Sequence, residues 1–426
     1  MQIIKHPNQS QWSEILQRPT IDNSTLFEQV GAVIDEVRQH GDKALRDFTL
    51  KFDGVSLENL EVTKEEIAEA EQNVQPELKQ AIEMARRNIW KFHSAQQREF
   101  SEIETSPGVF CWQKSVAIEK VGLYIPGGSA PLFSTVLMLG IPAQIAECKE
   151  IVLCTPPNKD GKVHPATLYA AKVAGVHRIF KVGGAQAITA MAYGTETIPQ
   201  VYKIFGPGNQ YVTATKQLVS LHGVAIDMPA GPSEVEVMAD ETANPIFVAS
   251  DLLSQAEHGA DSQSILVTTS ESLIDQILEQ IEIQLEQLPR KEIAKQALEH
   301  SKIILVKDIE EAIAITNAYA PEHLIISTRS YMVVAEHIVN AGSVFLGNTT
   351  PESAGDYASG TNHTLPTNGY AKAYSGVNLD SYMKKITFQQ ITPEGLTNIS
   401  NAIILMAENE GLQAHANAVR NRLLDI

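Results

Sequence analysis

The chain has few cysteines, no concentrated basic segment and no long apolar run. Its three cysteines, Cys111, Cys148 and Cys154, have no C-x-x-C spacing, which argues against a disulfide scaffold and a thiolate zinc cluster. Acidic side chains outnumber basic ones by 51 to 33, giving a formal charge of −18. A nucleic-acid partner is therefore not expected, because phosphate backbones are bound by clustered cations.

No stretch approaches the roughly 18 uncharged apolar residues that a membrane-spanning helix needs, and the N-terminus has no apolar signal-peptide segment. The sparse cysteines fit a reducing compartment. We therefore expect a cytoplasmic protein with no membrane partner.

The glycine fingerprint G-x-G-x-x-G opening a helix is also missing. Other glycine turns, at Tyr124–Gly128, Gly183–Gln186 and Gly206–Asn209, would let a backbone approach a phosphate or nucleotide closely. The residue pattern alone therefore does not establish NAD binding.

The 426 residues are too many for one simple core, so two or more domains are expected. Apolar periodicity predicts a helix from Ser24 to Gly41 and a short helix ending at Gly54. A capping-box pattern at Thr63–Glu66 opens a helical region over 63–97 that Pro76 interrupts. From Val121 onward, strands and helices alternate. Strands are predicted at 121–126, 151–154, 178–182, 234–238, 264–268 and 303–306, and helices at 134–146, 166–174, 244–258 and 272–288.

This alternation predicts an α/β fold with two Rossmann-like parallel-sheet units related by duplication, each binding ligands at the carboxyl ends of its strands. A helical N-terminal region and a C-terminal tail, with helices predicted at 396–406 and 408–424, complete the chain. The expected divisions are an arm (1–20), a helical region packing on the second unit (21–120), the first unit (121–232), the second unit with the metal site (233–380), and a tail (381–426) that crosses to a partner subunit.

Gln255 and His258 are the first candidate site residues. They are three residues apart near the end of a predicted helix that stops at Gly259, so their side chains share one face. Taken alone, a histidine near a helix end is more often a cap or a surface residue. Three downstream stretches strengthen the functional interpretation.

Glu322 and His323 are adjacent, just before an apolar run, and in a loop both could face one pocket as proton-transfer groups. A solvated turn is an equally good reading of that tetrapeptide. The loop 347–366 is long and rich in small residues, and its Asp356 is an oxygen donor that could complete the Gln255 and His258 pair. Glu410 and His415 in the tail read, by themselves, as an exposed helix face.

Together these stretches resemble the histidinol dehydrogenase family over essentially the whole chain. The longest matching motifs are Ser-Gln-Ala-Glu-His-Gly-x-Asp-Ser-Gln and Gly-Asp-Tyr-Ala-Ser-Gly-Thr-Asn-His. The matching segments are Val121–Leu137, Val182–Ala187, Phe205–Asn209, Asp227–Glu234, Asp251–Gln263, Pro321–Ile326, Gly342–Pro366 and Glu410–His415.

The resemblance implies oxidation of L-histidinol to L-histidine through L-histidinaldehyde, with two NAD⁺ reduced and one zinc per subunit. It implies a homodimer with shared sites, in which Glu410 and His415 serve the partner. The implied metal ligands are Gln255, His258, Asp356 and His415, and the implied catalytic pair is Glu322 and His323. The implied substrate contacts are Ser233, His323, His363, Glu410 and the four metal ligands, and the implied NAD contacts are Tyr124, Gln186 and Asn209.

Under this interpretation, we expect His323 to accept a proton in both oxidations and Glu322 to activate water for the aldehyde step. Two rival interpretations remain. A zinc hydrolase or lyase could use the same ligands with Glu322 as base, and would reduce no NAD⁺. A non-catalytic metal-binding or small-molecule-binding α/β protein would keep its ligand affinity without the Glu322–His323 pair.

Overall fold

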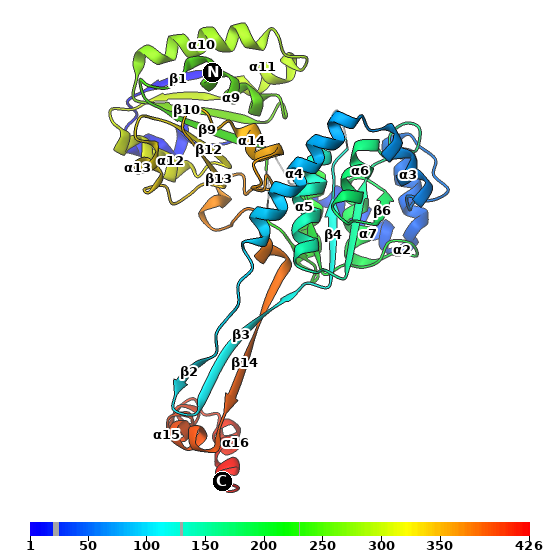
Figure 1. Cartoon of the computed structure of the whole chain (residues 1–426), viewed down its shortest axis with the longest axis vertical. Helices are drawn as coiled ribbons and strands as arrows, with labels where there is room; N and C mark the ends of the chain where they lie inside the picture. Colours follow the sequence, from blue (N-terminus) through cyan, green and yellow to red (C-terminus); the bar gives the residue numbers. More distant parts are fainter. Residues whose placement is uncertain (20–24, 128–130, 230) are drawn as a thin grey trace.

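The computed structural model describes residues 1–19, 25–127, 131–229 and 231–426. Two α/β lobes lie side by side, and a narrow stalk leads away from them to a small helical tail that carries the C-terminus (Figure 1). The predicted helix start at Ser24, the predicted boundary after residue 20 and the end of the glycine turn at Gly128 lie outside the described residues.

The first lobe is built on a five-stranded, fully parallel sheet in the order β6-β5-β4-β7-β8. Its elements are β4 (Lys120–Tyr124), α5 (Phe133–Ile145), β5 (Glu150–Thr155), α6 (Pro165–Val173), β6 (Arg178–Lys181), α7 (Gly184–Tyr193), β7 (Lys203–Phe205), α8 (Gln210–Ser220) and β8 (Ala225–Ile226). Helices cover both faces of this sheet and bury an apolar core on each. The predicted strand–helix alternation is confirmed here.

The second lobe holds a six-stranded parallel sheet in the order β1-β11-β10-β9-β12-β13. Its elements are β1 (Gln2–Lys5), α1 (Trp12–Ile15), β9 (Glu234–Ala239), α9 (Pro245–Ala256), β10 (Gln263–Thr268), α10 (Glu271–Leu285), α11 (Lys291–Glu299), β11 (Lys302–Leu305), α12 (Ile309–Tyr319), β12 (His323–Ser327), α13 (Tyr331–Ala335), β13 (Ser343–Leu346) and α14 (Glu352–Tyr357).

When the strands of each lobe are numbered in chain order, both sheets have the strand order 3-2-1-4-5. In the second sheet, β1 from the N-terminal arm is added at the edge. In each sheet, the chain changes direction beside the first strand, as in doubly wound folds. The shared order supports the predicted duplication, which remains a prediction.

The helical N-terminal region packs on the first lobe, so the expectation that it packs on the second was wrong. Its helices are α2 (Leu26–Asp53), α3 (Lys64–Asn73) and α4 (Pro76–Ser94). Helix α2 contacts α7 and α8, α3 contacts α6, and α4 contacts α5. The apolar stripe of α2, with Ile34 and Leu45, joins the core on one face of the first sheet, and Ile82 and Ile89 of α4 join the core on the other.

Local signals in this region behave as predicted. Helix α2 is interrupted at Gly41, whose φ of 51° is left-handed, and it ends at Gly54. Thr63 and Glu66 form the capping box that opens α3, and Pro76 starts α4.

The stalk is a three-stranded antiparallel sheet formed by segments far apart in the sequence. It contains β2 (Ile103–Ser106), β3 (Val109–Ala117) and β14 (Met383–Ile391), in the order β14-β3-β2. Trp112 of β3 stacks on Phe388 of β14, with ring centroids 5.5 Å apart. The end of the expected helical region and the start of the expected helical tail are therefore strands. The tail then continues as α15 (Pro393–Asn409) and α16 (Gln413–Leu423), the two helices that were predicted.

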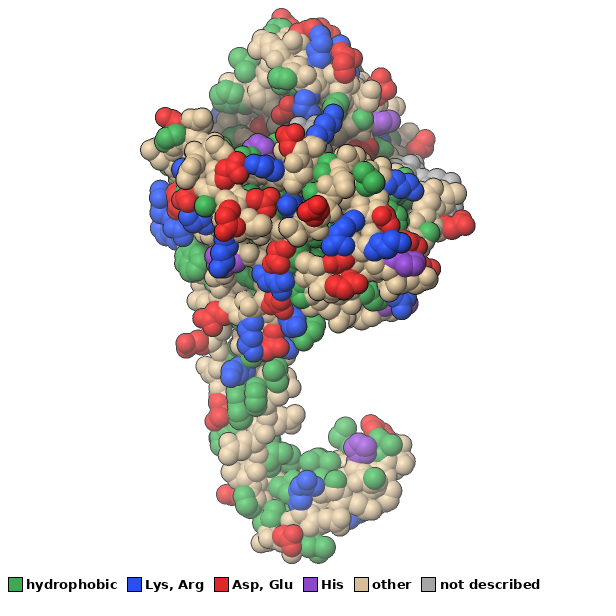
Figure 2. All heavy atoms as spheres, turned by 90° about the vertical axis from the view of Figure 1, so that its right-hand side faces the viewer, with side chains coloured by type: hydrophobic (Ala, Val, Ile, Leu, Met, Phe, Trp, Pro, Cys, Tyr) green, Lys and Arg blue, Asp and Glu red, His purple; other side chains and the backbone are tan. Residues whose placement is uncertain are grey.

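Stalk and tail expose many apolar side chains, which Figure 2 shows along the stalk and on the hooked tail. In the tail, Met406 is 65% exposed and Leu405 is 50% exposed. Within the described part of the chain, no helix has the length and apolarity needed to cross a membrane.

Candidate active site and metal centre

The candidate residues of the second lobe gather at the amino edge of its sheet, where the strands begin. Glu234 starts β9, Gln263 starts β10 and His323 starts β12. These residues do not lie at the carboxyl ends of the strands, where ligand binding was expected. A cavity of about 740 Å³ does lie at the carboxyl edge, lined by Asp240 and Thr328 among others, but it contains none of the candidate residues.

Glu322 and His323 do face one site. Helix α12 ends at Tyr319, Ala320 takes a left-handed φ of 56°, and Pro321 leads directly into the pair. The Glu322 carboxylate accepts a hydrogen bond from Glu234 N at 2.9 Å. His323 Nδ1 lies 3.1 Å from Glu234 O and 3.6 Å from Glu322 Oε2.

The carbonyl of Glu234 fixes the tautomer of neutral His323. A carbonyl oxygen only accepts, so Nδ1 carries the hydrogen and Nε2 keeps its lone pair. Nε2 is buried without a hydrogen-bond partner among the described residues, 3.7 Å from Asp356 Oδ1. In the neutral ring, the Nε2 lone pair therefore faces the site.

His258, Glu352 and Asp356 form a cluster suited to a metal ion, with their ligand atoms all within 4.8 Å of one another. Helix α9 ends at Ala256 rather than Gly259, so Gln255 lies in its last turn and His258 just beyond it. Two acceptors flank the Gln255 carboxamide, which assigns its nitrogen to the side facing them; in this orientation the nitrogen donates to Glu352 Oε1 at 3.2 Å and to Glu234 O at 3.3 Å. Its amide oxygen consequently points away from these two acceptors.

Glu352 was not among the predicted site residues. It is buried, and it starts α14, four residues before Asp356. Residues four apart lie on one face of a helix, and the Pro-Glu start of that helix was readable in the sequence. This spacing was the signal that could have found it.

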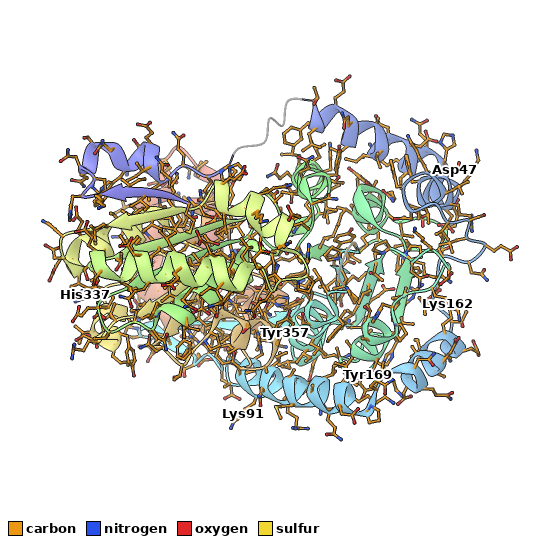
Figure 3. The ribbon with its side chains drawn as sticks, turned by 90° about the horizontal axis from the view of Figure 1, so that it is seen from above. Asp47, Lys91, Lys162, Tyr169, His337 and Tyr357 are labelled. Atoms are coloured by element: carbon orange, nitrogen blue, oxygen red, sulfur yellow. The ribbon has the colours of Figure 1, made fainter. Side chains whose placement is uncertain are left out.

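The loop after α14 joins the two lobes at the site. His363 Nδ1 donates to Asp356 O at 3.0 Å, and its Nε2 lies 3.1 Å from the hydroxyl of Thr135 on α5. Asn362 Nδ2 donates to Met138 O, also on α5, at 2.7 Å. Figure 3 shows Tyr357, at the end of α14, near the junction between the lobes. Ser233, half-buried, directly precedes Glu234.

Glu410 and His415 do not join the cluster within one chain. Glu410 follows the last residue of α15 and His415 lies in the first turn of α16, and both are exposed. These helices lie at the far end of the stalk from β12 and α14 (Figure 1). Within one chain, the tail therefore holds Glu410 and His415 away from the other candidate residues.

Tyr124, Gln186 and Asn209 lie at the carboxyl edge of the first sheet. Tyr124 ends β4, and its hydroxyl accepts a hydrogen bond from Gly184 N at 2.9 Å. Gln186 is buried in the first turn of α7, and Asn209 caps α8 through its carboxamide oxygen. The strand order reverses between β4 and β7, the position where doubly wound sheets bind nucleotides.

The buried charges of the cluster shift one another. Burial raises the pKa of Glu322 to about 8 and that of Glu352 to about 7. Burial lowers the pKa of His323, but the carboxylates of Glu322, Glu352 and Asp356 outweigh it and hold that pKa well above its ordinary value. Burial raises the pKa of Asp356, but the neighbouring His323 more than offsets it, so the pKa is lowered. The raised pKa values of Glu322, Glu352 and His323 mean that this group of side chains binds protons more readily than it would in water.

Fold and site together define a two-lobed α/β protein with a histidine–carboxylate centre where the lobes meet. A solved structure of NAD-dependent aldehyde dehydrogenase from Sinorhizobium meliloti has this fold, with a TM-score of 0.50 at 13% identity, covering 86% of this chain and 87% of that one. At this identity the likeness concerns the fold alone.

The chain belongs to the histidinol dehydrogenase family, whose profile matches residues 16–423. A histidinol dehydrogenase of Bacteroides fragilis strain YCH46 is 66% identical over 426 residues, which cover all of both chains. The crystal structure of histidinol dehydrogenase from Elizabethkingia anophelis superposes with a TM-score of 0.98 at 57% identity, covering 100% of this chain and 98% of that one.

The raised pKa of Glu322 predicts a pH-dependent stability. The folded pKa of about 8 lies above the ordinary value of 4.5, so the native state binds the additional proton between these values. Stability from this group is therefore lost as the pH rises through this window, with a slope of at most about 1.4 kcal/mol per pH unit. We expect Glu322→Gln to gain stability relative to wild type as the pH rises.

Denaturant unfolding of chelator-treated protein at several pH values measures this difference. Glu279→Gln, on the exposed face of α10, is the matched control and should run parallel to wild type. Parallel curves for Glu322→Gln as well would contradict the assignment.

Proposed function

We propose that this protein oxidises L-histidinol to L-histidine through L-histidinaldehyde, the last step of histidine biosynthesis, using one zinc per subunit and reducing two NAD⁺. The observation that carries the proposal is the end-to-end 66% identity with a histidinol dehydrogenase. The convergence of Glu322, His323, His258 and Asp356 at one edge of the second sheet supports it. The three cysteines are unpaired, which fits the cytoplasm as its compartment.

The donor set fits zinc. His258 and Asp356 supply an imidazole and a carboxylate within 4.8 Å of each other, and Gln255 is held next to them by Glu352. With His415 from a partner subunit, the set would contain two imidazoles, an amide oxygen and a carboxylate, all common zinc ligands. When bound, zinc would orient the imidazole and amine of the substrate, and its charge would lower the pKa values of the groups around it.

The first lobe fits NAD⁺, which would accept the hydride in each oxidation. The N-termini of α7 and α8 open at the carboxyl edge beside Tyr124, and neither helix has an acidic residue in its first turn. The positive dipole ends of helix N-termini favour phosphate groups there. The docking of the Asn362–His363 loop on α5 keeps this lobe against the proposed substrate site.

In the proposed reaction, His323 Nε2 accepts the hydroxyl proton of histidinol while the hydride leaves the same carbon. Glu322 then takes a proton from water as the water oxygen bonds to the aldehyde carbon, and the protonated His323 returns its proton to the aldehyde oxygen, giving the hydrated aldehyde. His323 accepts a proton again when the second hydride leaves, and the carboxylic acid results. The buried Glu322 has a pKa near neutrality, which suits a group that accepts and releases a proton in one cycle.

We further propose a homodimer with shared sites. The tail that carries Glu410 and His415 lies at the end of the stalk, away from its own lobes, and no part of the chain that the structure describes covers its exposed apolar side chains. A neighbouring subunit whose site received this tail would gain both the fourth zinc ligand and a substrate contact.

The overall activity is tested by counting reduced cofactor per histidine formed from histidinol and excess NAD⁺, with and without a chelator. We expect about two reduced NAD⁺ per histidine, as two successive hydride transfers require, and loss of activity on metal removal that zinc restores. A hydrolase or lyase would form no reduced cofactor, and a purely binding protein would consume no substrate.

The division of labour between the catalytic pair is tested by single-turnover assays of each half-reaction. His323→Asn should slow both oxidations by about 10²–10⁴-fold, the usual contribution of a general base. Glu322→Gln should slow the oxidation of histidinaldehyde and spare that of histidinol. Equal losses in both half-reactions for Glu322→Gln would refute its role in activating water.

Site sharing is tested by co-expressing two inactive variants, His258→Ala and His415→Ala. Each hybrid dimer would keep one intact site, so random pairing should restore roughly a quarter of wild-type activity. The matched control pairs His258→Ala with Asp356→Ala, whose defects lie in the same half of the site, and should restore nothing. No recovery in the first pairing, despite isolated hybrid dimers, would exclude shared sites.

A further inference from the structure

Glu234 contacts three of the groups to which the proposed function assigns roles. Its backbone nitrogen donates to Glu322 Oε2 at 2.9 Å, and its carbonyl oxygen accepts from His323 Nδ1 at 3.1 Å. The same carbonyl accepts from the Gln255 carboxamide at 3.3 Å. The position of this one peptide segment therefore sets the orientation of the catalytic pair and of one metal ligand.

The side chain of Glu234 is held by Arg18, from the N-terminal arm. Arg18 Nε donates to Glu234 Oε1 at 2.6 Å and Nη2 donates to Oε2 at 2.8 Å. Their side chains are only 14% and 3% exposed. The backbone nitrogen of Asn368 also donates to Oε1, at 2.5 Å. A two-pronged, charge-assisted contact of this kind fixes direction as well as distance.

The same guanidinium holds the turn that precedes the catalytic pair. Arg18 Nη2 donates to Tyr319 O at 2.8 Å and to Ala320 O at 3.3 Å, and the guanidinium lies 3.9 Å from the centre of the Tyr319 ring. Ala320 has a left-handed φ of 56°, which is costly for a residue with a Cβ atom unless its surroundings hold it. Pro321 and Glu322 follow at once.

We propose that Arg18 is a positioning residue that ties the amino end of β9 to the turn leading into β12. By holding Glu234 and Ala320 together, it keeps His323 in the Nδ1–H tautomer with Nε2 free, and keeps Gln255 turned for metal binding. The inference rests on the proposed function. A buried ion pair often adds little net stability compared with a well-packed apolar pair. We therefore assign Arg18 a role in positioning the site residues in addition to any contribution to stability.

The contact geometry makes Arg18→Lys the informative variant. Lysine keeps the positive charge beside Glu234, so that buried carboxylate is not left uncompensated. Its single ammonium does not reproduce the planar fork that spans the Glu234 carboxylate and two backbone carbonyls. Glu234→Gln is the second variant, because it removes the buried charge and keeps the backbone if Arg18→Lys fails to fold.

Lys302→Met is the matched control. Lys302 Nζ donates to Ile15 O at 2.5 Å and to Gln17 O at 3.2 Å, so it holds the same arm without touching Glu234. A loss caused only by loosening of the arm would appear in this variant too.

Three measurements on the purified full-length protein test the proposal. ¹⁵N-histidine NMR of the zinc-free protein, recorded at a pH high enough for His323 to be neutral and with His323→Asn used for assignment, reports the tautomer of His323. Competition with a chelator, using zinc alone as the probe, reports metal affinity. Steady-state assays separate kcat from the KM for NAD⁺.

For Arg18→Lys, we expect a mixture of His323 tautomers and roughly 10–100-fold losses in zinc affinity and kcat, as is usual for partners that orient ligands. The KM for NAD⁺ should stay within about twofold, because that site lies on the other lobe. Lys302→Met should resemble wild type throughout.

The proposal is overturned if folded Arg18→Lys, or Glu234→Gln in its place, keeps the wild-type tautomer and zinc affinity, or if Lys302→Met shows the same losses. The NMR and zinc measurements use no histidinol. A wild-type protein that failed to oxidise histidinol would therefore refute the proposed function while these two measurements still decided the role of Arg18.

Discussion

Four carboxylates, those of Glu234, Glu322, Glu352 and Asp356, share a small volume at the amino edge of the second sheet. Each loses most of its hydration there, and ionised carboxylates in such surroundings need hydrogen bonds or positive charge beside them. Arg18 neutralises Glu234, and His323 lies between the other three. The chain supplies fewer cations than the cluster needs, and a divalent ion would make up the difference.

Several parts of the structure surround or position this cluster of carboxylates. The second lobe supplies the strand ends, the first lobe closes one side through α5, and the N-terminal arm sends Arg18 into the interior. The stalk carries the tail away from all of these.

The sequence predicted the features that depend on neighbouring residues, but not those that depend on contacts between distant segments. The alternating elements, the Gly41 break and the Thr63 capping box depend on neighbouring residues and were predicted correctly. The packing of α2–α4 and the pairing of β3 with β14 depend on contacts between distant segments, so periodicity carried no signal for them. Arg18 and Glu234 are separated by more than two hundred residues, and no motif surrounds Arg18. The candidate ligands came from the family resemblance, whereas Glu352 emerged only when α14 was seen to place it beside Asp356.

The candidate site residues of the second lobe lie at its amino edge, and none of them lies at the opposite end of the sheet. The strands are four to six residues long, so about 13–20 Å separate the loops after β9, β11 and β12 from the site. Loops that only close a sheet tolerate insertion far better than loops that hold reacting groups. We therefore expect this end of the molecule to be the better place for an inserted segment, such as a fused domain or a fluorescent reporter.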